Sequence, residues 1–342
     1  MAALFSLFLT FLALTFLPLK RFADEYGLLD VPDGRKDHMY PTPQVGGILV
    51  IMSVLITAAV FPNIYEKHLI LLLCLAVVSM LGVADDRLDL DYRIRLIGVT
   101  GLAIIMMLSG IGLNSLGDLF GTGPVHLGIT SIFVTVCAVL GCVNAFNMID
   151  GIDGLLSAVS SVTLLSLAYL FQQQENIEHT QICLIVFMAL VPCFLFNIGA
   201  FGAVRRIFMG DSGSMFLGFL IVWMLVEGSG NELKAFNATT ALWLIAVPLM
   251  DMAAVITGRC VNKKLPFSAS KDHIHHILLK QGLSNLQVLF FVTLLSSIMA
   301  IVGILLDVNN VSDSVSFSLF LILFVLYLAI FRIESVIKNI IN

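Results

Sequence analysis

Apolar segments long enough to cross a membrane recur along the whole chain. A helix needs about 20 such residues to cross the hydrocarbon core of a bilayer. The composition agrees, because 59% of the 342 residues are hydrophobic and only 12% are charged, whereas soluble domains are about half apolar and about a quarter charged. The sequence therefore predicts an all-α polytopic integral membrane protein. We expect about eleven transmembrane helices, near residues 1–19, 45–61, 68–84, 95–113, 127–146, 154–171, 180–198, 212–227, 239–258, 286–306 and 315–332.

The basic residues predict how these helices are oriented. Sixteen of the 18 Lys and Arg residues lie in or beside every second connection, and only Lys67 and Lys234 lie in the others. Because cytoplasmic connections carry an excess of Lys and Arg, the N-terminus is expected outside and the C-terminus in the cytoplasm. The predicted inner loops are residues 20–44, 85–94, 147–153, 199–211 and 259–285.

An acidic run follows the third apolar segment. Asp85, Asp86 and Asp89 cannot lie unpaired in hydrocarbon, so this run is expected where a helix meets water. On a helix, Asp85 and Asp89 share one face, and carboxylate oxygens suit Mg²⁺. Taken alone, the run is equally compatible with a solvated helix end whose charges pair with nearby arginines.

A second polar motif lies at the end of the fifth predicted span. Asn144, Asn147, Asp150 and Asp153 recur every three residues, so their side chains follow one side of a helix. The glycines after the two aspartates let a ligand approach the backbone closely. A helix break capped by Asn and Asp is the alternative, and four polar residues in one row make it the weaker interpretation.

A third motif, residues 208–214, opens the eighth predicted span. Asp211 or Ser212 could simply cap that helix. The free N–H groups of a helix N-terminus also attract anions such as phosphate, and a carboxylate there could hold Mg²⁺ against them.

Histidines form the fourth motif. His273, His275 and His276 lie in the longest inner loop, downstream of Arg259 and two lysines. Three histidines could bind zinc, but one short cluster rarely completes a zinc site. In a loop this basic, donors to a diphosphate are the better interpretation, and solvated loop charges are the alternative.

Together, the motifs predict a Mg²⁺-dependent enzyme that joins a cytosolic, phosphate-bearing donor to a membrane lipid, since phosphoryl transfer needs mainly positioning and charge neutralisation. Nothing in them indicates nucleic-acid binding. A secondary transporter is the alternative of another class. It would place polar residues near the bilayer midplane and show paired, broken repeats, and neither is evident here.

The four motifs, in this order, resemble those of the polyprenyl-phosphate N-acetylhexosamine-1-phosphate transferase family. The resemblance covers essentially the whole chain and is strongest to the members that use UDP-GlcNAc. It implies eleven helices in a single transmembrane domain, residues 1–342, whose five inner loops form a cytoplasmic active site in the bacterial inner membrane. The implied reaction converts UDP-GlcNAc and undecaprenyl phosphate to GlcNAc-diphospho-undecaprenol and UMP. That reaction is the first membrane step of O-antigen or enterobacterial-common-antigen-type glycan synthesis.

The resemblance also implies residue roles. Asp211 matches the principal Mg²⁺ ligand, and Asn147 matches a second ligand. Mn²⁺ is the expected substitute metal. Asp85 matches a carboxylate that deprotonates the lipid phosphate, with Asp86 beside it, so the implied catalytic residues are Asp85, Asp86 and Asp211. The implied substrate-binding residues are Asp150 and Asp153 near the uridine, Phe208 stacked on uracil, Arg259, His273, His275 and His276 at the diphosphate, and Asp30 and Lys36 in the first inner loop.

Several questions stay open at this point. Relatives that use UDP-MurNAc-pentapeptide carry three consecutive histidines, and Ile274 interrupts them here, which favours UDP-GlcNAc. A donor with another UDP-HexNAc sugar stays open, because no sequence motif distinguishes such epimers. The resemblance also leaves a homodimer open. Asp251, inside the ninth predicted span, is either a functional carboxylate or a buried partner of polar neighbours.

Overall fold

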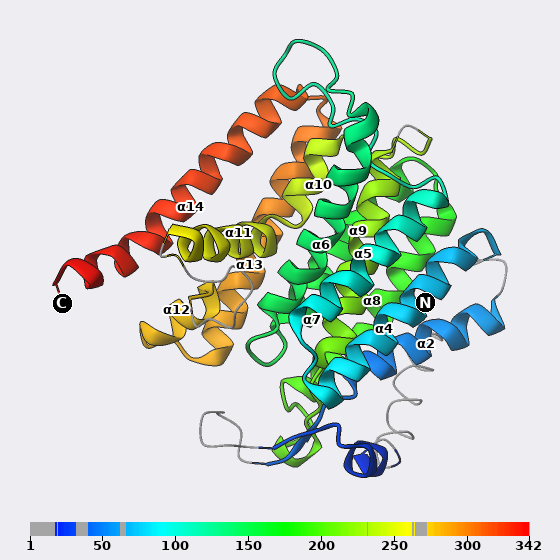
Figure 1. Cartoon of the computed structure of the whole chain (residues 1–342), viewed down its shortest axis with the longest axis vertical. Coiled ribbons are helices and arrows are strands. Elements are labelled where there is room, and N and C mark those ends of the chain that lie inside the picture. Colours follow the sequence, from blue (N-terminus) through cyan, green and yellow to red (C-terminus); the bar gives the residue numbers. More distant parts are fainter. Residues whose placement is uncertain are drawn as a thin grey trace.

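The computed structural model describes residues 18, 20–31, 40–61, 66–230, 232–261, 263 and 272–341. This part of the chain is almost entirely helical (Figure 1). Its α-helices are α2 (Gly46–Val60), α4 (Leu69–Leu88), α5 (Tyr92–Leu108), α6 (Ser131–Ile149), α7 (Leu155–Gln173), α8 (Ile177–Asn197), α9 (Gly210–Ser229), α10 (Ala238–Leu244), α11 (Ala246–Val261), α12 (Ile274–Lys280), α13 (Asn285–Val308) and α14 (Asp313–Ile341). Short 3-10 turns are η1 (Glu66–His68), η2 (Gly128–Thr130) and η3 (Ala203–Arg205).

The all-α membrane class is confirmed. In the described part, seven helices are long and apolar enough to cross a membrane, or eight if the pair α10 and α11 counts as one span. The shorter helices α2 and α5, of 15 and 17 residues, lie at two further predicted spans. The predicted first span, residues 1–19, is outside the described residues apart from Pro18, so the count of eleven stays a prediction.

Helix α9 is the centre of the bundle. Every residue from 212 to 226 is buried, as expected for a helix that is apolar on all sides. Helices α2, α4, α6 and α7 pack around it (Figure 1). The polar start of α9 therefore lies at one end of the bundle and its last turn at the other.

Two glycines bring neighbouring helices onto the start of α9. A Cβ atom on Gly47 of α2 would overlap the backbone of Gly213, and one on Gly82 of α4 would overlap the backbone of Ser212. Small residues let helix backbones approach this closely. The first turn of α9 is thus held between the beginning of α2 and the last turns of α4.

The predicted span at residues 239–258 is broken into two helices, because α10 and α11 meet at an angle of 81°. Pro248 has no N–H, and its ring would collide with the carbonyl of Leu244 in a continuous helix. That carbonyl instead accepts a hydrogen bond from Thr163 Oγ1, at 3.0 Å. After the break, α11 runs across the bundle toward α14 (Figure 1).

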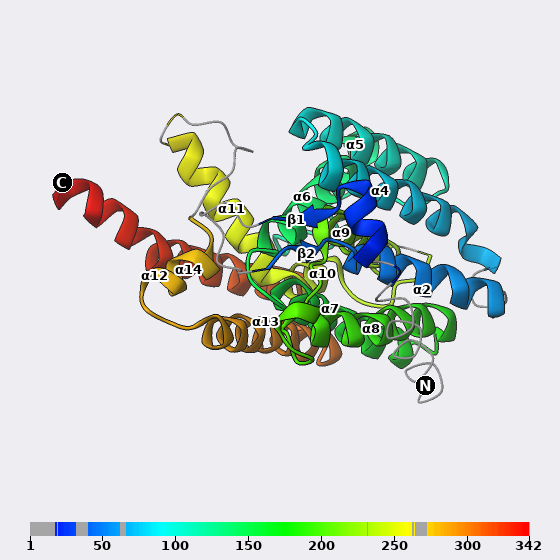
Figure 2. The ribbon, with the colours of Figure 1, turned by 90° about the horizontal axis from the view of Figure 1, so that it is seen from below.

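A small hairpin joins the first predicted inner loop to the segment before α9. Strand β1 (Leu29–Asp30) pairs antiparallel with β2 (Thr42–Pro43). Phe208 N donates to Pro43 O, and Gly46 N donates to Phe208 O, both at 2.8 Å. Seen from this end, the hairpin crosses the middle of the bundle (Figure 2).

Replacing Gly82 with Ala should destabilise the fold by about 1–3 kcal/mol, because the new methyl group must displace the backbone of α9. Gly101→Ala in α5 is the matched control, since nothing lies within 4 Å of a Cβ there. That change should be neutral or stabilise by about 1 kcal/mol or less. Thermal unfolding in detergent measures both, and equal midpoints for the two variants would contradict the close packing.

Candidate active site

A cavity of about 510 Å³ opens at the end of the bundle where α9 begins, a size typical of small-molecule sites. All five predicted inner loops contribute to its wall. The structure thus brings together segments far apart in the sequence. The predicted site residues that line it are Asp30, Asp86, Asn147, Asp150, Asp153, Phe208, Asp211 and His276.

Asp86 caps the first turn of α9. Its Oδ1 accepts from Asp211 N at 2.7 Å and its Oδ2 from Ser212 N at 3.1 Å. These are two of the backbone donors that a helix N-terminus leaves unsatisfied. The alternative interpretation, in which Asp211 or Ser212 caps this helix, is therefore wrong. The N–H groups of Asp211 and Ser212 bind this carboxylate, so these two donors of the helix start are not free for phosphate.

Asp211 and Asn147 lie side by side in the cavity. Asn147 Nδ2 donates to Asp211 Oδ1, and also to Ser214 Oγ at 2.8 Å. The side chain of Asp211 is 34% exposed, so its carboxylate remains accessible. Carboxylate and amide oxygens at this position are the donor types that Mg²⁺ prefers.

The charge balance of the cavity also favours a cation. Burial raises the pKa of Asp150 to about 8, and neighbouring carboxylates, first among them Asp211, add to the shift. Without a cation this carboxyl group is therefore protonated near neutral pH. The donor set and the unbalanced negative charge both fit a divalent metal at Asp211.

Asp85 lies beside the cavity rather than in its wall. It is 5% exposed and accepts from Leu90 N at 2.9 Å and from Arg95 Nη1 at 2.8 Å. The same Arg95 nitrogen is 4.0 Å from Asp211 Oδ1. Arg95 therefore links the two aspartates. Arg95 is one of the nearby arginines that the sequence offered only as partners of the acidic run. Its position in the first turn of the next helix is the signal that could have identified it as a site residue.

Arg206 and Asn197 are two further wall residues that the motifs did not identify. Arg206 Nη1 is 2.8 Å from Asp153 Oδ2, forming an ion pair. Asn197 Nδ2 donates to Ile207 O at 2.7 Å, and Asn197 Oδ1 accepts from Gly154 N. Asn197 thereby holds the start of α7 against the segment that leads into α9.

Asp251 anchors the histidine segment. Its Oδ1 accepts from Ile274 N at 2.8 Å and from Tyr327 Oη at 2.9 Å, and His273 Nδ1 lies 2.7 Å from its Oδ2. This resolves the open question about Asp251, which is a buried partner of polar neighbours. Asp251 thus fixes the start of α12 against α11 and α14.

Of the three histidines, only His276 lines the cavity. His275 is 1% exposed, and its ring fills the space where Gly151 lacks a Cβ atom. Burial lowers the pKa of His275 to about 3, so its ring is neutral and the prediction that it is a cationic donor is wrong. Arg259 and His273 are buried and outside the cavity wall, and Lys36 lies outside the described residues.

Comparison with known proteins agrees with this geometry. The family model described as "Glycosyl transferase family 4" matches residues 68–229. Undecaprenyl-phosphate alpha-N-acetylglucosaminyl 1-phosphate transferase of Escherichia coli strain K12 is 35% identical over 310 residues, covering 90% of this chain and 84% of the relative. The enzymes of the same name from Salmonella typhimurium (36%, 96% of this chain, 89% of the relative) and Haemophilus influenzae (35%, 94% and 92%) are similarly close.

The chain belongs to glycosyl transferase family 4. It is a multi-pass membrane transferase, and the family predicted from its motifs is confirmed. The family-model match extends from the start of α4 to the end of α9. It includes the acidic run, the Asn/Asp row and the start of α9, which together form the acidic side of the cavity. The hairpin and α12, which complete the wall, lie outside that match.

His275 should make this transferase less stable in acid. Its folded pKa lies below that of an unfolded histidine, so folding disfavours the protonated ring and stability falls as pH drops below about 6.5. Between pH 7 and pH 5 this costs about 2 kcal/mol. His275→Gln cannot take up the proton and should lose less stability over that interval. Thermal midpoints at both pH values measure this, with exposed His126→Gln as control; an unchanged pH dependence in His275→Gln contradicts it.

Proposed function

We propose that this chain transfers GlcNAc-1-phosphate from UDP-GlcNAc to undecaprenyl phosphate and releases UMP. The observation that carries the proposal is the acidic cavity at the end of an apolar helix bundle, where a soluble diphosphate and a lipid phosphate can meet. The names of the relatives, which specify undecaprenyl phosphate and an α-N-acetylglucosaminyl 1-phosphate group, support the same substrates.

On the donor side, Asp211 and Asn147 would hold Mg²⁺, with Mn²⁺ as a substitute. A metal bound there neutralises the diphosphate and improves UMP as a leaving group. Phe208 lies in the cavity wall and offers an aromatic face for uracil. Asp150 and Asp153 line the same wall, with Arg206 paired to Asp153, and would bind the uridine.

On the acceptor side, Arg95 is placed to attract the lipid phosphate. Its guanidinium is held by Asp85 at 2.8 Å and lies 4.0 Å from Asp211. A phosphate oxygen of the lipid attacks the β-phosphorus of UDP-GlcNAc, the bond from that phosphorus to the bridging oxygen breaks, and UMP departs with that oxygen. Asp85 would take a proton from a protonated lipid phosphate, with Asp86 fixing the helix start beside it.

The distribution of basic residues supports a site on the cytoplasmic side of the membrane, and the bacterial relatives support the bacterial inner membrane. The product would begin O-antigen or enterobacterial-common-antigen-type glycans of the lipopolysaccharide layer. UDP-MurNAc-pentapeptide and other UDP-HexNAc donors are the alternatives, and a donor panel distinguishes them. The polar groups of the cavity gather at one end of the bundle, unlike the midplane site of a transporter.

Purified protein given UDP-GlcNAc and undecaprenyl phosphate should release UMP only when Mg²⁺ or Mn²⁺ is present. Asp211→Asn should lower the rate roughly 100-fold or more, because the metal loses its carboxylate, while membrane insertion stays normal. Coupled detection of UMP measures both. Absence of UMP, or release without any divalent ion, would refute the proposal.

Arg95→Gln should slow UMP release roughly tenfold or more. The change removes the ion-pair partner of Asp85 and the cation that would attract the lipid phosphate. Arg93→Gln is the matched control, since Arg93 is exposed and contacts Tyr92 on the same helix. It should retain near wild-type rates. Equal losses in the two variants would show that Arg95 acts only through general surface charge.

A further inference from the structure

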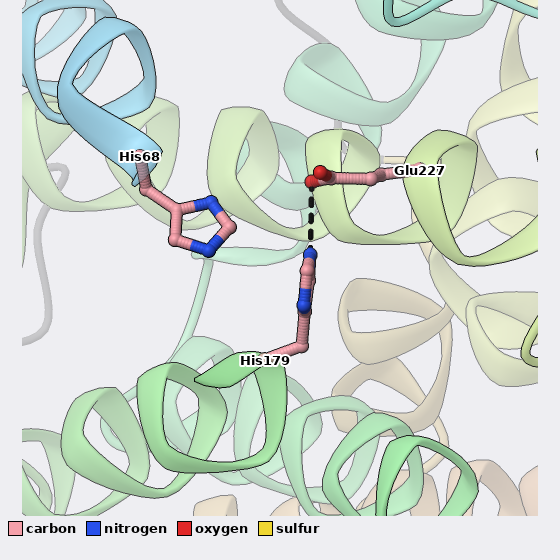
Figure 3. Close-up of side chains that lie close together, drawn as sticks. All are labelled: His68, His179 and Glu227. Carbon is pink, nitrogen blue, oxygen red and sulfur yellow. Dashed lines mark ion pairs between the residues drawn. The ribbon is translucent and has the colours of Figure 1, made fainter. Parts of the chain in front are cut away.

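A buried cluster of ligand-type side chains lies at the end of the bundle opposite the cavity. His68 precedes α4, His179 is in the first turn of α8, and Glu227 is in the last turn of α9. Figure 3 shows the three side chains pointing toward one another. One ligand atom from each lies within 4.8 Å of the others. Since α4 has 20 residues, it separates this cluster from Asp85 and Asp86 by about 25–30 Å.

The hydrogen bonds of His179 fix which ring nitrogen carries its proton. Asn176 Oδ1 lies 2.7 Å from His179 Nδ1 and also accepts from His179 N at 3.2 Å. The backbone hydrogen bond identifies this atom of Asn176 as the amide oxygen, which can only accept. His179 Nδ1 must therefore carry the proton and donate it to Asn176 Oδ1. In the neutral ring, Nε2 then presents a lone pair toward the cluster. A carboxylate or carbonyl behind a histidine orients metal ligands in the same way.

That lone pair faces a second acceptor. His179 Nε2 is 3.2 Å from Glu227 Oε2, yet the nitrogen has no hydrogen-bond partner among the described residues. Trp223 Nε1 donates to Glu227 Oε2 at 2.9 Å and so orients the carboxylate. A ring-nitrogen lone pair and a half-buried carboxylate oxygen this close require either a proton or a metal cation between them.

His68 supplies a second lone pair. Its side chain is buried, and its Nε2 likewise has no hydrogen-bond partner among the described residues. Burial, followed by the neighbouring His179, lowers the pKa of His68, which disfavours a positive charge on this ring. An unpaired buried ring nitrogen costs stability unless something binds it.

We propose that His68, His179 and Glu227 form a second metal site, which takes a Zn²⁺-class ion. Two imidazoles and one carboxylate are a common ligand set for Zn²⁺, with water in the fourth position. Mg²⁺ prefers oxygen ligands and disfavours this set. The carboxylate of Glu178 lies beside the cluster, with its Oε2 3.8 Å from His68 Nε2.

The site has a structural role. It joins the start of α4, the start of α8 and the end of α9, and α4 and α9 are also the helices that carry Asp85, Asp86 and Asp211. Metal binding stabilises the native state by mass action when the unfolded chain binds the ion more weakly. The metal thus holds the start of α4 and the end of α9 together. The opposite ends of these two helices carry the carboxylates at the cavity.

The test uses the full-length protein in detergent, treated with chelator and then dialysed against Zn²⁺ with excess Mg²⁺. Elemental analysis should find one Zn²⁺ per chain, and Zn²⁺ should raise the thermal midpoint by about 5 °C. His68→Gln and His179→Gln should lose both effects. His126→Gln, which removes an exposed histidine, is the matched control and should keep both.

Co²⁺ loaded into the wild-type protein provides a readout that does not depend on how the variants fold. It should give the intense visible absorption of a four-coordinate site with two histidine nitrogens. No zinc uptake by the wild type, or equal uptake by His179→Gln and the wild type, overturns the proposal. In the first case, an imidazolium–carboxylate pair between His179 and Glu227 is the correct description.

Discussion

The hydrogen bonds from the first turn of α9 to Asp86 are the interaction on which the rest of the site depends. They join α4 to α9, two helices that Gly82 already brings into close backbone contact. A buried helix start must have its N–H groups satisfied, and here a carboxylate from α4 satisfies two of them. As a result, the carboxylate of Asp211 is left to face the cavity and can take part in binding.

The cavity also has to accommodate several carboxylates with few cations. Two arginines offset part of the charge, since Arg206 pairs with Asp153 in the cavity wall and Arg95 pairs with Asp85 beside the cavity. Burial, together with the remaining negative charge, raises the pKa of Asp150. A divalent metal bound together with the substrate would offset the remaining negative charge of the cavity. The acidic cavity is therefore organised for a ligand that carries both a cation and phosphates.

Periodic features of the sequence were sufficient to predict much of this arrangement. Apolar length predicted the helices, and spacing and loop charge predicted that five separate segments would meet at one end. The bend before α11 has a visible cause in Pro248, but the hydrogen bond from Thr163 that satisfies the carbonyl of Leu244 at the bend comes from α7. Local pattern alone does not reveal such a contact between distant helices.

The polar pairings were harder to predict for the same reason. The cap by Asp86, the link through Arg95 and the anchor at Asp251 each join residues that only the packed bundle brings together. His275 is a residue type that often binds ligands, yet here it is buried against Gly151 and acts as a packing residue. Its role became clear only when its surroundings were known.

The most direct test of this account asks whether the metal at Asp211 contacts the donor diphosphate. Mn²⁺ bound to the protein with UDP-GlcNAc can be examined by electron–nuclear double resonance for coupling to ³¹P. The account predicts a strong ³¹P coupling that disappears in Asp211→Asn. Tight Mn²⁺ binding without ³¹P coupling, or coupling that persists in Asp211→Asn, would contradict it.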